Sequence, residues 1–504
     1  MQHSQVRRVI RQRRKLQAWQ EQQAQPSYDN VTWMQFISRY TIGSHIHGFY
    51  QLFWPTMRRR MRLLWALALL SALTVLIYVA YLLGERHQRH HFHTIIADSH
   101  WPIQNIAFPV IVVCNKNRLN WSRLPQIIQR YNISLAQQPL LERVLTAYDA
   151  LSFARFDVFA PLKDQPLQTL NHLNFTRIAT EMAWRCDELL AECRWQTESR
   201  DCCELFRPRR LPLGSCLAFN EVEQRAIVEI GSGSGLMVRL RLNEAQHAPE
   251  NVELKGFMLN ILEPNVWFDF PIEFFPDMDS TIGIRAVYHF YDEDTYSMHS
   301  QQRMCLQDYE HVSDNIHTLQ GLKYMMENCF AECQQLYMLR YCNCTLDLFY
   351  PPSDHVACQL KDLPCLAAHN HEMESYEQPG EHSYVAHAES GLICECLHNC
   401  KSLTLINDVR KFVQRPLQRV NVSDRTSYRP ENRSMLLDIY YKRFNILVYK
   451  TSLIYSWMDL IVSFGAICQL CLGCSIIGIL EVLYFGLIDV PHFYWRRYAL
   501  RRFG

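Results

Sequence analysis

Two long apolar stretches stand out in the pattern of hydrophobic and polar positions along the chain. Leu63–Leu83 is a run of 21 residues without a charge, which as a helix is about 31 Å long and matches the core of a bilayer. Leu460–Leu480 is a second such run, and its apolar character continues to Ile488. The first run is too long and too far from the N-terminus for a cleaved signal peptide. Each run alone could be a buried core helix, but together they predict two membrane spans.

Arginines flank both spans on the sides that the positive-inside rule assigns to the cytosol. They are Arg58, Arg59, Arg60 and Arg62 before the first span and Arg496, Arg497, Arg501 and Arg502 after the second. We therefore predict a multi-pass plasma-membrane protein with both termini in the cytoplasm. The expected domains are a cytoplasmic tail at 1–62, a transmembrane helix at 63–83, an extracellular domain at 84–450, the second transmembrane helix with the segment before it at 451–489, and a cytoplasmic tail at 490–504.

The pattern between the spans is mixed. Val252–Leu262, Thr281–Tyr291 and Leu436–Tyr449 are rich in Val, Ile, Phe and Tyr with partial alternation, which predicts strands. Asp314–Leu339 has a helical pattern, and the polar stretch Leu366–Ser390 predicts a surface loop. The expected fold class is therefore a membrane α+β protein, in which two helices flank a large mixed α/β extracellular domain.

Composition narrows the class further. The 504 residues carry 51 Lys+Arg against 50 Asp+Glu, for a net charge of +1, which argues against a nucleic-acid partner. Sixteen of the 19 cysteines lie between the spans, as an oxidising compartment predicts. The same segment holds six N-x-S/T sequons, which are candidate glycosylation sites. They are Asn120, Asn132, Asn174, Asn343, Asn421 and Asn432.

Catalytic signatures are missing from the sequence. It contains no G-x-S-x-G, H-E-x-x-H or Walker motif, so we expect neither an enzyme nor a cofactor. Gly231–Gly235 alternates glycine and serine, and we interpret it as a flexible turn rather than a phosphate cradle.

Eight short motifs follow one another in a fixed order. They are Ser44-His45-Ile46-His47-Gly48, Phe108-Pro109-Val110-Ile111-Val112-Val113-Cys114-Asn115, Gly214-Ser215-Cys216-Leu217-Ala218-Phe219-Asn220, Gln302-Arg303-Met304-Cys305, Cys329-x3-Cys333, Cys342-x-Cys344, Cys394-x-Cys396-x3-Cys400 and Gly473-Cys474-Ser475. In this order they resemble the degenerin/epithelial sodium channel family, and the short tails and extra cysteines are most similar to its insect pickpocket branch. The resemblance extends from about His47 to Glu481.

The resemblance implies a trimeric, sodium-selective and usually amiloride-sensitive channel that is gated through a clenched-hand extracellular domain. Its partners would be sodium ions, membrane lipid and two further copies or related subunits. The alternative is a non-conducting accessory subunit, or a receptor-like two-pass protein that assembles with pore-forming relatives. The resemblance does not indicate the gating stimulus.

The second span carries the candidate pore. Ser463, Ala466, Leu470 and Gly473 form a stripe at helical spacing, whose small members suit a narrow pore or, alternatively, ordinary packing between helices. In the family, the motif at Gly473, Cys474 and Ser475 interrupts the helix and forms the selectivity constriction.

Two further features are placed by the resemblance. Three copies of Glu481 would attract cations below the filter, although a snorkelling interfacial carboxylate is the alternative. His47 and Gly48 would lie in a cytosolic re-entrant stretch that affects gating.

The sequence also departs from the family's pattern. Ser463 stands where acid-sensing members have an outer aspartate, and Val462 occupies the position at which bulky side chains lock degenerin pores open. Cys474 replaces the usual alanine, Ala466 replaces a glycine and Tyr484 replaces a lower aspartate. These changes bear on amiloride affinity and on conduction by this chain alone.

Spacing cannot determine how sixteen cysteines pair, but the resemblance implies seven bridges. They are Cys114–Cys216, Cys186–Cys193, Cys305–Cys400, Cys329–Cys396, Cys333–Cys394, Cys342–Cys365 and Cys344–Cys358. Cys202 and Cys203 remain, either bonded to each other or to another partner. Zinc binding at the C-x-C pairs is the weaker alternative, because no C-x2-C pair of the zinc-finger type is present.

Four histidines, His87, His90, His91 and His93, follow the first span. They are typical of a solvated linker, and the alternative is a sensor of protons, zinc or copper.

Overall fold

The computed structural model describes residues 32–44, 47–53, 57–89, 92–152, 155–248, 255–275, 278–310, 317–374, 376–377, 391–413, 433–473 and 475–503. It divides the chain into two compact units, residues 1–92 with 453–504 and residues 93–452. The second unit begins and ends within ten residues of the boundaries expected for the extracellular domain.

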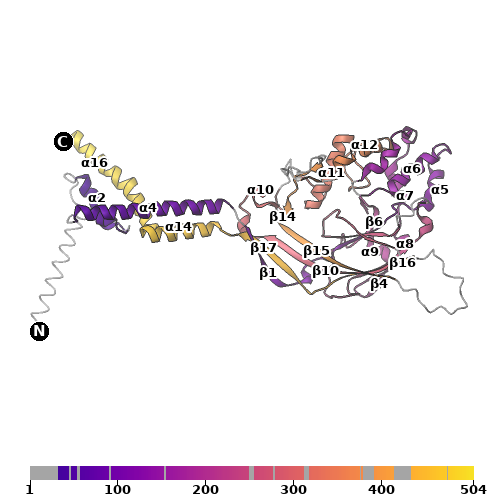
Figure 1. Ribbon diagram of the computed structural model, residues 1–504, viewed down its shortest axis with the longest axis horizontal. Helices are drawn as coiled ribbons and strands as arrows, with labels where there is room; N and C mark the ends of the chain where they lie inside the picture. Colours follow the sequence, from indigo (N-terminus) through magenta and orange to yellow (C-terminus); the bar gives the residue numbers. More distant parts are fainter. Residues whose placement is uncertain are drawn as a thin grey trace, which may run out of the picture. The chain divides into compact units, whose positions relative to one another are not determined.

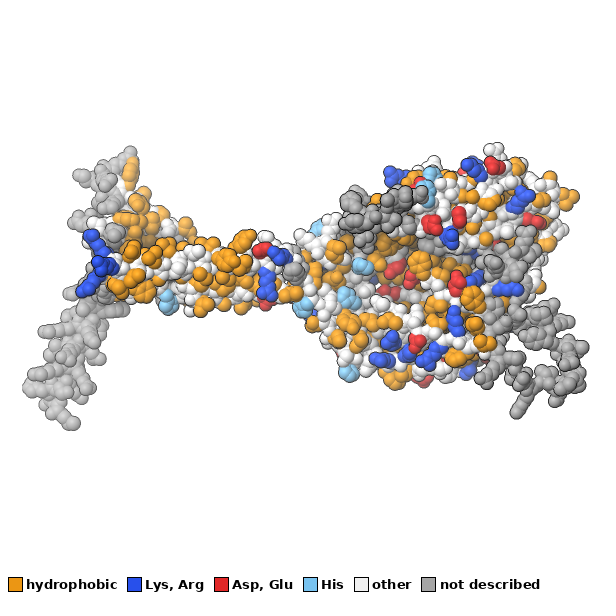
Figure 2. All heavy atoms as spheres, viewed as in Figure 1, with side chains coloured by type: hydrophobic (Ala, Val, Ile, Leu, Met, Phe, Trp, Pro, Cys, Tyr) orange, Lys and Arg blue, Asp and Glu red, His pale blue; other side chains and the backbone are white. Residues whose placement is uncertain are grey.

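The first unit is helical. Its elements are α2 (Trp33–Gly43), α3 (Phe49–Phe53), α4 (Arg59–Gln88), α14 (Trp457–Leu472), α15 (Ile476–Tyr484), a π-helical turn (Phe485–Asp489) and α16 (Val490–Phe503). Helices α4 and α14 pack side by side (Figure 1). Two helical stretches are long and apolar enough to cross a membrane, Arg59–Gln88 and Ile476–Trp495. Figure 2 shows hydrophobic side chains over much of the visible surface of this unit, as expected of helices that face lipid or neighbouring chains.

Two sheets form the framework of the second unit (Figure 1). The larger has eight strands in the order β1-β17-β10-β16-β7-β3-β4, with β15 added against β10, and the smaller has the order β5-β6-β2-β8-β9. Two further sheets pair β11 with β14 and β12 with β13. The strands are β1 (Phe92–Pro102), β2 (Val110–Asn115), β3 (Leu190–Trp195), β4 (Glu198–Arg200), β5 (Phe206–Leu211), β6 (Gly214–Phe219), β7 (Leu236–Leu242), β8 (Phe257–Leu262), β9 (Ile272–Phe274), β10 (Met278–Tyr291), β11 (Cys305–Leu306), β12 (Tyr376–Glu377), β13 (Leu392–Ile393), β14 (His398–Asn399), β15 (Lys401–Val413), β16 (Arg433–Tyr441) and β17 (Asn445–Leu453).

Strand β2 shows how the sequence builds the core. All six of its residues are buried, as in strands covered on both faces. Its alternate side chains enter two cores: Val110 and Val112 join the helical side, whereas Ile111 and Val113 pack between the two sheets. The helices of this unit are α5 (Leu124–Arg130), α6 (Gln138–Asp149), α7 (Phe175–Glu181), α8 (Cys186–Leu189), α9 (Cys202–Leu205), α10 (Ser300–Arg303), α11 (Met326–Cys342), α12 (Leu363–Ala368) and α13 (Asn370–Met373).

Strand β10 confirms the strand predicted at Thr281–Tyr291, and β8 confirms the part of Val252–Leu262 that the structure describes from residue 255 onward. The single strand expected at Leu436–Tyr449 is wrong, because the chain leaves β16 at Tyr441 and re-enters the sheet as β17. Both strands run parallel to β10, each along a different half. Between them, the side chain of Lys442 crosses Gly283, where a Cβ would lie 2.6 Å from its Cδ.

The helix expected at Asp314–Leu339 begins later, at Met326, because residues 317–325 form turns that include Gly321 at φ +79°. The loop expected at Leu366–Ser390 is also partly wrong. Its start is helical, since Leu366 and Met373 are fully buried side chains of α12 and α13. Residues 378–390 of that stretch lie outside the described residues.

Candidate functional site

The helix of the second span ends at Gly473. This residue is the C-cap of α14 with φ 64° and ψ 19°, and Ser475 starts α15 by accepting a hydrogen bond on Oγ from the Gly478 N–H at 3.2 Å. A left-handed residue ends the regular ladder, so carbonyls of the last turn become available to other donors. The helix is therefore interrupted where the family's motif predicts. Cys474 lies outside the described residues.

His47 and Gly48 lie at this break. The backbone N–H of His47 donates to the carbonyl of Leu472 at 2.9 Å. The imidazole lies against Gly473, where a Cβ would be 1.4 Å from His47 Nδ1. Gly48 has φ +79°, and a Cβ there would lie 3.3 Å from the Trp65 ring of α4. Glycine is therefore required at 473 both by conformation and by space, and it is favoured at 48 by its positive φ.

The small-residue stripe faces away from the first span. Cys468 is the buried side chain of α14, the helix that packs on α4. At about 100° per residue, Cys468 lies roughly half a turn around the helix from the middle of the stripe. Ala466 and Leu470 are exposed, the latter at 86%, whereas Ser463 is half-buried. Ala466 and Leu470 are thus free in one chain to line a pore or to contact a neighbour, whereas Gly473 is covered by the His47 imidazole.

Val462 is also exposed, at 64%, on the outer half of α14. The start of this helix is fixed by a capping box, in which Ser456 Oγ and the Asp459 carboxylate bond to each other's backbone N–H groups. Asp459 is therefore occupied with helix capping.

Glu481, in α15, is half-buried and lines a cavity of about 740 Å³.

Aromatic residues of α2 form a cluster that the sequence interpretation missed. Tyr40 stacks on Phe485 at 3.9 Å between ring centroids, and Phe36 stacks on Phe493 at 4.5 Å. Trp33 completes the cluster at 5.6 Å from Phe493. The spacing of Trp33, Phe36 and Tyr40 is that of one helical face, a signal that the sequence did contain.

Eight disulfides hold the second unit, and six are those that the resemblance implies. Four of them, Cys329–Cys396, Cys333–Cys394, Cys342–Cys365 and Cys344–Cys358, bind α11 and its C-terminal end to flanking segments. We call α11 with these bridges the α11 clamp. Because its C-x-C cysteines are all bonded to sulfur, the zinc alternative is excluded for them.

The expected bridge between Cys186 and Cys193 is wrong. Cys186 bonds Cys203, and Cys193 bonds Cys202. The adjacent cysteines lie in the short helix α9, which follows the hairpin of β3 and β4. Cys193 faces the core of β3, next to buried Cys202, whereas Cys186 lies in α8 before that strand. The pair Cys202 and Cys203 therefore reaches two different elements.

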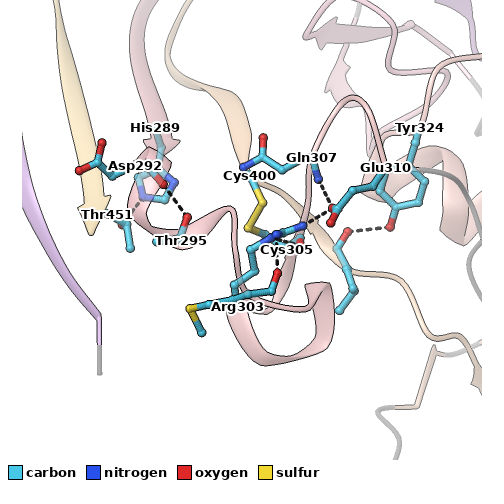
Figure 3. Close-up of a disulfide and its surroundings, with 12 residues drawn as sticks. His289, Asp292, Thr295, Arg303, Cys305, Gln307, Glu310, Tyr324, Cys400 and Thr451 are labelled. Carbon is cyan, nitrogen blue, oxygen red and sulfur yellow. Dashed lines mark hydrogen bonds and ion pairs between the residues drawn. A yellow bond between two sulfur atoms is a disulfide. The ribbon is translucent and has the colours of Figure 1, made fainter. Parts of the chain in front are cut away.

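The bridge Cys305–Cys400 lies beside a buried arginine (Figure 3). The side chain of Arg303 is 0% exposed; its guanidinium donates to the carbonyl of Met298 at 2.8 Å and forms an ion pair with Glu310. A buried charge is tolerated only with such partners. The ion pair and the disulfide thus fix the turn that joins β10 to the α11 clamp.

Hydrogen bonds tie together the strands that lead toward the spans. The Thr451 hydroxyl in β17 contacts His289 in β10 (Figure 3). It lies 2.7 Å from His289 Nε2 and 2.7 Å from Thr94 Oγ1 in β1. Burial lowers the pKa of His289. His93 Nε2 lies 3.3 Å from the Ser452 hydroxyl, so His93 takes part in a contact between strands. His87 lies in α4, and His90 and His91 are outside the described residues.

Carboxyl groups near the start of α11 have raised pKa values. Burial raises the pKa of Glu263 to about 7, and the negative charges of Glu327 and Asp308 add to the shift. Burial likewise raises the pKa of Glu327 and brings that of Glu332, further along α11, to about 7. Burial therefore shifts the pKa values of Glu263 and Glu332 toward neutral pH.

The glycosylation site predicted at Asn120 is wrong. Asn120 is fully buried, and its Oδ1 accepts hydrogen bonds from the Ser122 N–H and hydroxyl, which leaves no room for a glycan. Asn132, Asn174 and Asn343 are exposed and stay candidate sites. Asn421 and Asn432 lie outside the described residues.

The turn predicted at Gly231–Gly235 is confirmed, with Asp438 accepting hydrogen bonds from it.

The second apolar helix that is interrupted at Gly473, the contact of His47 with that break and the disulfide-rich sheet domain are the features of a two-span channel subunit. The sequence pattern of the family described as amiloride-sensitive sodium channel matches residues 40–485. The chain belongs to this family, whose members are plasma-membrane ion channels rather than enzymes, and it is a sodium channel subunit.

Three similar proteins illustrate the range of the family. Pickpocket protein 19 of Drosophila melanogaster is 26% identical over 88% of each chain. The sodium channel protein Nach of Drosophila ananassae is 22% identical over 76% of this chain and 73% of its own length. Acid-sensing ion channel 2 of Danio rerio is 23% identical over 83% and 76%, respectively.

Proposed function

We propose that three copies of this chain, or of this chain and related subunits, conduct sodium along a path lined by α14 and α15. The break at Gly473 carries this proposal. Backbone that leaves a helix at membrane depth is stable only where it faces water or is buried in protein. Carbonyls freed at such a break can replace part of the hydration shell of a cation.

The residues at and around the break support specific roles. Gly473, Cys474 and Ser475 form the constriction, while Ser463, Ala466 and Leu470 line the wider outer path. His47 and Gly48 support the break from the cytosolic side, because the imidazole fills the space that a Cβ at 473 would occupy. Both termini are cytoplasmic, and the chain is embedded in lipid.

Glu481 attracts cations to the inner mouth. It follows the break by two helical turns and is half-buried beside a cavity. An ionisable side chain at the end of a span is costly unless it faces water or a partner. Three such carboxylates would raise the local cation concentration and so favour cation entry.

The extracellular unit transmits the gating stimulus. Four bridges make the α11 clamp stiff, and the fifth, Cys305–Cys400, joins it to the turn after β10. Strand β10 is bonded to β17, which continues in sequence to α14. A movement of the clamp therefore has a continuous covalent and hydrogen-bonded route to the pore helix.

The second candidate, a non-conducting accessory subunit, is favoured by Ser463, which supplies no negative charge to the outer path. Expression of the chain alone, with surface biotinylation and whole-cell recording, separates the two. Sodium current that disappears on sodium replacement supports conduction. Surface protein without current, and current only with a related subunit, supports the accessory role.

A further inference from the structure

The inner half of the second span contains a π-helical turn. Helix α15 ends at Tyr484, the π turn occupies Phe485–Asp489, and α16 continues from Val490. Such turns are rare and frequently lie at functional sites. The cause lies in the sequence: Pro491 has no N–H to donate to the carbonyl of Leu487, and in a continuous α-helix its ring would clash with that carbonyl. The helix therefore widens just before the proline.

The π turn changes the direction in which Asp489 points. In a continuous α-helix, Asp489 would lie about 80° around the axis from Glu481, at roughly 100° per residue. A π turn uses one residue more than an α turn, because its hydrogen bonds run i→i+5; the angle therefore falls by roughly 100°, and Asp489 comes within roughly 20° of the direction of Glu481. Both carboxylates accordingly line the same cavity of about 740 Å³. Asp489 lies on the face of Glu481, about two turns further toward the C-terminus.

The aromatic cluster of α2 holds this turn in place. Tyr40 and Phe36 both stack on Phe485, the first residue of the π turn, at centroid distances of 3.9 and 5.2 Å. Tyr40 also forms a wall of the cavity. The direction of Asp489 is thus fixed by packing within one chain.

Asp489 itself is half-buried, and its side chain forms no ion pair with the residues that the structure describes. A carboxylate at the end of a span is costly unless water or a partner stabilises it. We propose that Asp489 is a second conductance-determining carboxylate, which faces the inner mouth on the cytosolic side of Glu481. This inference deepens the proposed function and rests on it.

Unitary sodium currents in excised inside-out patches test the inference. Asp489→Asn should lower outward conductance about twofold at roughly 10 mM salt, because three charges then no longer concentrate cations at the inner mouth. At about 1 M salt the difference should vanish, since the screening length falls from about 30 to 3 Å. Asp489→Glu should retain the wild-type conductance. Glu85→Gln is the matched control. This carboxylate lies near the C-terminal, extracellular end of α4, far from the inner mouth, and pairs with Arg89.

A charge-conserving variant separates position from net charge. Gly486 is exposed, has open space for a side chain and does not line the cavity. We expect Gly486→Asp together with Asp489→Asn to conduct like Asp489→Asn alone. Rescue by this variant, or a conductance of Asp489→Asn equal to that of Glu85→Gln, would overturn the inference while leaving the sodium channel intact. Wild-type protein at the surface without any current would overturn both.

Discussion

Replacing Gly473 by alanine should disrupt the helix break through two separate costs. The left-handed conformation at φ 64° costs a non-glycine residue about 1–2 kcal/mol. The new Cβ would also lie 1.4 Å from His47 Nδ1, so the imidazole must leave. Its departure endangers the hydrogen bond from the His47 N–H to Leu472, worth about 1 kcal/mol net. The intact break is therefore disfavoured by about 2–3 kcal/mol, or roughly 30- to 150-fold in population.

The sodium-to-potassium permeability ratio, from bi-ionic reversal potentials, measures this effect. We expect Gly473→Ala to lower the ratio markedly. Combining it with His47→Ala removes the imidazole and hence the steric cost, so the double variant should recover part of the ratio. In a double-mutant cycle the coupling should exceed about 1 kcal/mol. Additive effects of the two substitutions, or unchanged selectivity of Gly473→Ala, would refute the argument that this contact shapes the constriction.

Three further predictions concern the extracellular unit. Removing the bridge with Cys305→Ser and Cys400→Ser opens a loop of 95 residues and should lower the free energy of unfolding by about 4–5 kcal/mol. An unchanged urea midpoint of the detergent-solubilised chain would contradict this. Asn174→Gln should increase gel mobility by one glycan, whereas Asn120→Gln should not, because Asn120 is buried; a shift with Asn120→Gln would contradict the structure. Glu263 has its pKa raised to about 7, so the folded state binds its proton more tightly than the unfolded state. The free energy of unfolding should therefore rise by about 2.5 kcal/mol as pH falls from 7 to 4.5, and Glu263→Gln should remove that part of the pH dependence.

The spans and most of the disulfide framework could be predicted because their signals are local or ordered along the chain. Leu63–Leu83 is long and uncharged, and the cysteines of the α11 clamp follow a recognisable order. The resemblance implies the wrong partners for Cys186 and Cys193 because Cys202 and Cys203 are adjacent in sequence. Only the three-dimensional position of α9 separates the elements that these two cysteines reach.

Other features depend on contacts that no local pattern encodes. A sequon is a triplet, and nothing in the triplet at Asn120 reveals that tertiary packing buries it. The strand expected at Leu436–Tyr449 is apolar on both sides of its break, and the break depends on how Lys442 crosses Gly283 of another strand. The π turn does have a local cause in Pro491, but its effect on Asp489 follows only from the helix geometry.

Bi-ionic recording from the purified chain in a planar bilayer tests the central claim most directly. With sodium on one side and potassium on the other, we expect unitary currents whose reversal potential lies toward the sodium equilibrium potential. A chain of verified integrity that gives no unitary current, or one that does not distinguish sodium from potassium, would contradict the assignment of the broken helix as a sodium pathway.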